Sequence, residues 1–150
     1  MDLTKFTERA RGFVQSAQSI AVREDHQRLE PLHMLKALMD DREGFAANLI
    51  TRSGGDAAQL SAQIEQAFAK LPKVSGGSSQ MILDTSTAKV LSEAEKLAEK
   101  AKDQFVTVER ILTALAVVRS SAKEVLVVAK VSAQNLNSAI NDLRKGRTAD

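Results

Sequence analysis

The sequence contains no cysteine, tryptophan or tyrosine, and it has only five phenylalanine, two proline and seven glycine residues. Without cysteine the chain supports neither disulfide nor thiolate chemistry, which fits a reducing compartment and favours a cytoplasmic location. The scarcity of aromatic residues argues against a platform on which nucleic-acid bases stack. The scarcity of proline and glycine leaves long stretches that helices can occupy without interruption.

Neither sign of charge dominates, because 21 basic residues face 19 acidic ones and the net charge is only +2. The two signs are interspersed, so we expect neither a nucleic-acid partner nor a membrane partner. The longest apolar runs, such as VLVVA at 125–129, are far shorter than the roughly 18 residues that a membrane span requires. The N-terminal residues also lack the apolar run of a secretory signal.

A doubled apolar pattern is the main feature that the sequence does contain. The segments LEPLHMLKALMD (29–40) and VTVERILTALAV (106–117) lie 77 positions apart and place apolar residues at the same steps. An amphipathic segment precedes each of them, at 4–23 and at 86–102, and these two segments also match at an offset of 77. The spacing predicts that a helical unit occurs twice.

The doubling continues toward the C-terminus, where DAAQLSAQIEQA (56–67) matches SAQNLNSAINDL (132–143) at an offset of 76. A residue lost from a connecting loop accounts for the change of offset. Both segments begin with a good N-cap residue, Asp56 and Ser132.

A shorter helix is predicted in the middle of each unit, at 43–52 and 121–130. The second of these contains EVLVVAKV, whose β-branched residues by themselves favour a strand. Its repeat partner and the lack of another strand to pair with favour a helix.

These patterns predict an all-α fold of eight helices, arranged as two four-helix repeats that a pseudo-twofold axis relates within one compact domain. The domain is expected at 1–145, with repeat one at about 1–70, a Gly- and Ser-rich connector at 71–85 and repeat two at about 86–145. Residues 146–150 are interpreted as the start of a linker. We expect this chain to be a monomer in isolation, because each repeat buries its apolar faces against the other.

Signals for catalysis or cofactor binding are weak. His26 and His33 have no ligand cluster around them, so we interpret them as a solvated turn residue and a helix-surface residue rather than metal ligands. Neither glycine-rich stretch has the spacing of a phosphate-binding loop. We therefore expect no catalytic residue, no metal and no cofactor in these 150 residues.

Several segments together resemble the Clp N-terminal repeat domain family, and within it the bacterial disaggregase branch. The resemblance covers residues 1–145 and is carried by the 77-residue doubling and by EPLHMLKAL (30–38), LPKVSGG (71–77) and AEKLAEKAKDQFVTVERILTAL (94–115). It implies a domain that binds unfolded or aggregated polypeptide and passes it to ATPase modules of the same chain. Those modules, absent here, are expected to bind ATP and magnesium and to form a hexameric ring. The alternative is an adaptor-docking domain of a Clp protease ATPase.

A receptor for unfolded chains needs an apolar groove with a few polar groups at its rim. Residues 90–112 carry more apolar side chains than one core is expected to require. Asp103, in a turn, and Glu109, in the first turn of the next helix, border them, and repeat one has His26 and Leu32 at these positions. The resemblance adds Thr7, while Arg110 departs from the apolar residue common in the disaggregase branch and is expected to narrow the groove. The candidate substrate-binding residues are Thr7, Leu91, Leu97, Asp103, Phe105, Val106 and Glu109, and the other apolar residues weighed are Val90 and Val108.

Overall fold

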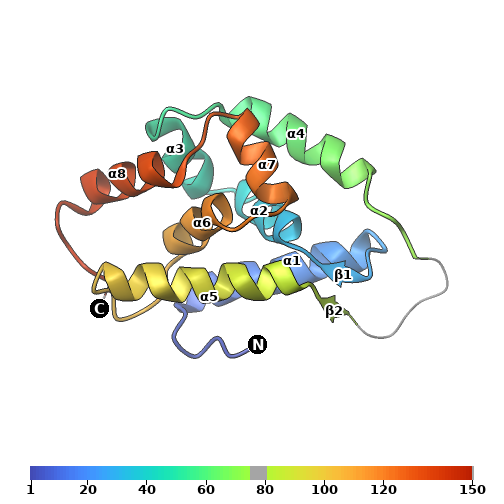
Figure 1. Cartoon of the computed structure of the whole chain (residues 1–150), viewed down its shortest axis with the longest axis horizontal. Helices are drawn as coiled ribbons and strands as arrows, with labels where there is room; N and C mark the ends of the chain where they lie inside the picture. Colours follow the sequence, from blue (N-terminus) through green and yellow to red (C-terminus); the bar gives the residue numbers. More distant parts are fainter. Residues whose placement is uncertain (75–80, 150) are drawn as a thin grey trace.

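Two helices with few exposed side chains, α2 (Pro31–Met39) and α6 (Val108–Val117), occupy the centre of the molecule (Figure 1). They correspond to the two segments whose apolar patterns match. The computed structural model describes residues 1–74 and 81–149. A helix that is apolar on most of its sides must be covered on most of its sides, and six further helices provide this cover.

The first repeat contains α1 (Glu8–Arg23), α3 (Phe45–Arg52) and α4 (Ala57–Ala69) around α2. The second contains α5 (Thr85–Lys100), α7 (Ser121–Val128) and α8 (Ala133–Arg144) around α6. The bounds of α5 are those of α1 moved by 77 positions, and α8 begins 76 positions after α4. The predicted all-α fold of eight helices in two repeats is confirmed for the part of the chain that the structure describes.

The segment with many β-branched residues forms α7, as the repeat predicts. Ser120 caps this helix, since its Oγ accepts a hydrogen bond from the Lys123 N–H. The helix packs against α4 and α6 through Ala122, Val125 and Leu126, which are buried. Packing on this face therefore prevails over the intrinsic preference of valine for strands.

The predicted N-caps of the last helix in each repeat are also confirmed. The Asp56 carboxylate accepts from the Gln59 N–H at 3.0 Å, and the Ser132 Oγ accepts from the Asn135 N–H at 3.1 Å. Gly54 follows α3 with a φ of +95°, a conformation that glycine adopts without steric cost. The turn between α3 and α4 thus has glycine at the position that needs a positive φ.

Two very short parallel pairings join the repeats, and the sequence did not indicate them. Strand β1 (Arg28–Leu29) pairs with β2 (Ile82–Leu83), and Phe6 forms an isolated bridge with Val106. At the offset of 77, Phe6 corresponds to Leu83 and Leu29 corresponds to Val106. The pairing of Phe6 with Val106 is therefore the repeat-related equivalent of the pairing of Leu83 with Leu29. Each repeat thus supplies an extended residue that pairs with the turn of the other repeat.

The connector is described only in part. Residues 71–74 leave α4 without regular structure, 75–80 lie outside the described residues, and β2 leads directly to Asp84, the N-cap of α5. Helix α5 therefore starts one residue before the segment predicted at 86–102, and β2 lies within the residues predicted as connector.

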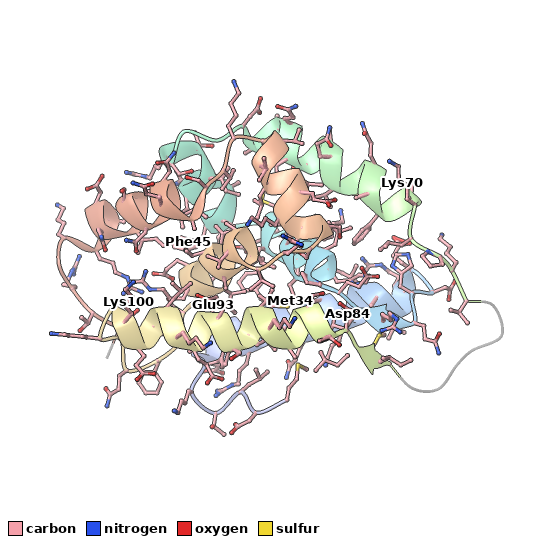
Figure 2. The ribbon with its side chains drawn as sticks, in the orientation of Figure 1. Met34, Phe45, Lys70, Asp84, Glu93 and Lys100 are labelled. Carbon is pink, nitrogen blue, oxygen red and sulfur yellow. The ribbon has the colours of Figure 1, made fainter. Side chains whose placement is uncertain are left out.

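A single core runs through both repeats and contains side chains from every helix. Met34 lies in its interior, whereas Lys70 and Lys100 point into solvent (Figure 2). Leu35 in α2 and Leu112 in α6 occupy equivalent positions and are both fully buried. The two repeats thus bury their central helices against each other.

Substituting either central leucine tests this shared core. We expect Leu35→Ala and Leu112→Ala each to lower the free energy of unfolding by about 2–5 kcal/mol, because each leaves a cavity in close-packed surroundings. Urea unfolding followed by circular dichroism measures the change. The half-exposed Leu83 is the control, and Leu83→Ala should cost less than about 1 kcal/mol. If only one of the two substitutions left the free energy of unfolding nearly unchanged, Leu35 and Leu112 would not have equivalent roles in the core.

Candidate functional site

The turn that follows α5 brings several charged residues together. Lys102 has a φ of +64°, which reverses the chain, and the Asp103 N–H then donates to the Ala98 carbonyl at 2.8 Å. The carboxylate of Asp103 points into the protein, where its side chain has no exposed surface.

Two arginines neutralise this buried carboxylate. Arg110 Nε lies 3.1 Å from Asp103 Oδ2, and Arg144 Nη1 lies 2.6 Å from Asp103 Oδ1. Arg144 also reaches Glu109 Oε2 at 3.0 Å and donates to the Thr107 Oγ1 at 3.1 Å. Asp103, Glu109, Arg110 and Arg144 form what we call the charged cluster, and it joins the turn after α5 to α6 and α8.

The equivalent place in repeat one contains aromatic rings instead of charges. His26 and His33 correspond to Asp103 and Arg110 at the offset of 77, and Phe68 corresponds to Arg144 at the offset of 76. His26 Nδ1 lies 2.9 Å from His33 Nε2, and the Phe68 ring packs against both imidazoles with centroid distances of 5.6 and 5.3 Å. His26, His33 and Phe68 are called the ring cluster below.

The hydrogen bonds of the ring cluster assign its tautomers. The Glu30 N–H donates to His33 Nδ1 at 3.0 Å, so neutral His33 carries its proton on Nε2 and donates it to His26 Nδ1. The proton of neutral His26 is then on Nε2, a buried atom without a hydrogen-bond partner among the described residues.

The two clusters respond to pH in different ways. Burial lowers the pKa of His33 to about 4, with a further contribution from His26, and burial also lowers the pKa of His26. Burial by itself raises the pKa of Asp103, but hydrogen bonds from the Ala149 N–H, Arg144 and Arg110 outweigh it and leave the pKa lowered. The ring cluster is therefore neutral and the Asp103 carboxylate is ionised at neutral pH.

Two hollows lie on either side of Arg144. The larger, about 500 Å³, lies between α5, α6 and α8 and contains Leu97, Arg110 and the amides of Gln134, Asn137 and Asn141. The smaller, about 270 Å³, is lined by Phe45, Glu109, Ile140, Leu143, Arg144 and Arg147. The smaller hollow is thus mainly apolar with charged groups at its edge, whereas polar and charged side chains form most of the lining of the larger one. Residues of α8 line both hollows.

The structure brings most of the predicted site residues to one end of the fold. The Thr7 N–H donates to the Val106 carbonyl at 2.9 Å, and the Thr7 side chain caps α1 by accepting from the Ala10 N–H. Phe105 is 40% exposed and Leu97 is half-buried, so both present apolar surface. Leu91 and Val106 are core residues, as are Val90 and Val108, which were weighed with them.

Two expectations about individual residues are wrong. Asp103 does not border an open groove, because its carboxylate is fully buried between two arginines. His26 and His33 are not solvated, since they are 5% and 0% exposed and bond to each other. Arg110, which was expected to narrow the groove, lines the larger hollow while it pairs with Asp103 and donates to Asn137 Oδ1 at 3.2 Å.

Arg144 was not among the residues predicted for the site. The repeat contained a usable signal, because Arg144 occupies the position of Phe68, a residue expected to be buried. Phe45 and Leu143, which line the smaller hollow, were not predicted either, because the sequence indicated surplus apolar side chains only at 90–112.

Within residues 1–74 and 81–149, no group of three His, Cys, Asp or Glu side chains is placed to hold a metal ion. None of the helices in those ranges has the length and apolar character needed to cross a membrane.

Comparison with known proteins agrees with this architecture. Residues 5–129 match the model of the Clp repeat (R) N-terminal domain, and the chain belongs to that family. The chaperone protein ClpB of Rhodopseudomonas palustris is 55% identical over 152 residues, and that of Agrobacterium fabrum is 54% identical over 151. Each alignment covers 100% of this chain and 17% of the relative, so the chain spans about one-sixth of the length of these relatives.

Solved structures show the same fold at lower identity. The Hsp104 N-terminal domain from Candida albicans has a TM-score of 0.85 at 23% identity, covering 97% of this chain and 95% of the other. The N-terminal domain of ClpD from Arabidopsis thaliana has a TM-score of 0.69 at 22% identity and covers 97% of both chains.

Removing one carboxylate from the charged cluster tests its contribution to stability. We expect Asp103→Ala to lower the free energy of unfolding by about 3–5 kcal/mol, because it leaves Arg110 buried without a counter-charge. Glu109→Ala is the control, since Glu109 lies at the edge and Arg144 keeps Asp103 as a partner; its cost should stay below about 1 kcal/mol. If urea unfolding gave the same decrease in the free energy of unfolding for both variants, the deeper burial of Asp103 would not increase its contribution to stability.

The ring cluster predicts a loss of stability in mild acid. The folded pKa of His33 is about 4 against 6.5 for the free side chain, so the unfolded chain binds protons first as the pH falls below 6.5. This linkage lowers the free energy of unfolding by about 2 kcal/mol between pH 7 and pH 5. Urea unfolding at the two pH values measures it.

The matched variant is His33→Gln, whose amide can accept from the Glu30 N–H and donate to His26. Because His26 and His33 are the only histidines, this variant should lose more than half of the difference between pH 7 and pH 5. An unchanged difference would place the acid sensitivity elsewhere.

Proposed function

We propose that this chain is the N-terminal substrate-binding domain of an ATP-dependent protein disaggregase. In this proposal it binds unfolded or aggregated polypeptide in the cytoplasm and passes it to ATPase modules of the same protein, which assemble as a hexameric ring. The family and the relatives named chaperone protein ClpB support the proposal. The modules that would use ATP and magnesium lie outside these 150 residues.

One observation carries the assignment of a binding surface. Exposed or half-buried apolar side chains surround the charged cluster at one end of repeat two, namely Leu97, Phe105 and Leu143. A receptor for unfolded chains needs apolar contacts that tolerate many side chains, and polar groups that fix the register of the bound segment.

The fold by itself does not require this surface, because repeat one has the same helices without it. Its equivalent end is filled by the ring cluster, and Phe105 corresponds to the polar residue Arg28. Apolar surface that one repeat lacks and the other exposes supports a role in binding rather than in folding.

Phe105 is the residue whose substitution tests the surface most directly. We expect Phe105→Ser to weaken binding of a permanently unfolded protein, such as reduced and carboxymethylated lactalbumin, by roughly 3- to 10-fold, because an exposed aromatic side chain contributes apolar contact area. Isothermal titration calorimetry measures the affinity, and native lactalbumin serves as the folded competitor.

The matched control is Val22→Ser, which removes a 64% exposed apolar residue from the last turn of α1. That turn lies beside β1, at the opposite end of the molecule from the C-terminus (Figure 1). Equal weakening by both variants would indicate unspecific apolar adhesion. Preference for a folded partner over the unfolded protein would instead favour docking of an adaptor.

A further inference from the structure

The turn formed by residues 103–105 binds a segment of the chain itself. The Ala149 N–H donates to Asp103 Oδ1 at 2.9 Å, and the Ala149 carbonyl accepts from the N–H groups of Gln104 at 2.6 Å and Phe105 at 3.2 Å. All three contacts use main-chain atoms of Ala149. The turn therefore recognises the N–H and the C=O of one residue, independently of the side chain.

The chain reaches this turn by reversing after α8. Lys145 and Gly146 have φ values of +52° and +86°, and the segment that follows returns toward the end of α5 (Figure 1). Residues 145–148 are exposed, whereas Ala149 is partly buried. The segment thus buries little of its own surface, and main-chain hydrogen bonds at Ala149 hold its far end.

Repeat one takes a similar course without building the same site. After α4 the chain also returns to the equivalent turn, where the Val74 N–H donates to the Asp25 carbonyl at 2.9 Å. The side chain at the position of Asp103 is His26, whose Nδ1 already accepts from His33. The combination of a carboxylate acceptor with the two N–H donors of Gln104 and Phe105 is therefore found at this turn in the second repeat and not at the equivalent turn of the first.

We propose that the 103–105 turn is a main-chain binding site for extended polypeptide, and that Ala149 occupies it as an internal ligand that an unfolded substrate displaces. This inference rests on the proposed function and adds to it a mode of recognition. Contacts to the backbone alone suit a receptor whose substrates share no sequence, because every residue except proline offers the same donor and acceptor. Phe105 contributes both an N–H group to this site and the exposed ring beside it.

Competition by the internal ligand predicts that weakening it strengthens substrate binding. Ala149→Pro removes the N–H that Asp103 accepts, while Ala149→Ser retains it. Because one hydrogen bond to a charged group is lost, we expect the proline variant to bind carboxymethylated lactalbumin roughly 3- to 10-fold more tightly than the wild type. The serine variant should bind as the wild type does.

Three further measurements separate the possible outcomes. A chain ending at Lys145 loses all three contacts of Ala149 and should show a gain at least as large as that of Ala149→Pro. Thermal unfolding should show that every variant is folded. In NMR spectra of the wild type, the amide signals of Gln104 and Phe105 should shift on addition of the unfolded protein. Equal affinities for the wild type, the proline variant and the shortened chain would overturn the main-chain site but leave the proposed function standing. Absence of binding by all of them would overturn both.

Discussion

Burial of α2 and α6 is the constraint on which the rest of the structure depends. Seven of the nine residues of α2 and eight of the ten residues of α6 are buried, so neither helix is stable on the surface of a domain. Each repeat alone has too few helices to surround its own central helix. When the two central helices pack together, with six amphipathic helices around them, both central helices are buried.

Equivalent backbones nevertheless carry different chemistry at their two ends. Three positions contain His26, His33 and Phe68 in one repeat and Asp103, Arg110 and Arg144 in the other. The first set packs as neutral rings and fills its space. The second leaves hollows around Arg144, because guanidinium groups held by carboxylates extend where the rings would pack. The two repeats thus share the same arrangement of helices, but only the end of repeat two is a candidate binding surface.

Most of the fold was predictable from the sequence because it follows from local patterns that occur twice. The offset of 77 located α1, α2, α5 and α6 to within a few residues. The repeat, at an offset of 76 between α3 and α7, also identified α7 as a helix despite Val125, Val127 and Val128. The strands β1 and β2 were not predictable, since two residues are too short for an alternating pattern.

The site was only partly predictable, because its key contacts join residues far apart in sequence. Asp103 and Arg144 are 41 positions apart in the sequence. The residues next to each of them suggest only a solvated charge, in a turn for Asp103 and at a helix end for Arg144. Their burial depends on how α8 packs against α6, which periodicity does not describe. Likewise, nothing near His26 indicates that Phe68 closes over it.

The reciprocal pairings have a consequence for the origin of the domain. Phe6 pairs with Val106 and Leu83 with Leu29, so each copy of the unit provides an extended segment to the other and receives one in return. A single copy would leave both its segment and its receiving turn unpaired, and a second identical copy would satisfy both through a twofold axis. That is the geometry of an isologous homodimer, in which the same surface serves both partners. Fusion of two such subunits into one polypeptide would make the association independent of concentration and would free each half to change its sequence separately.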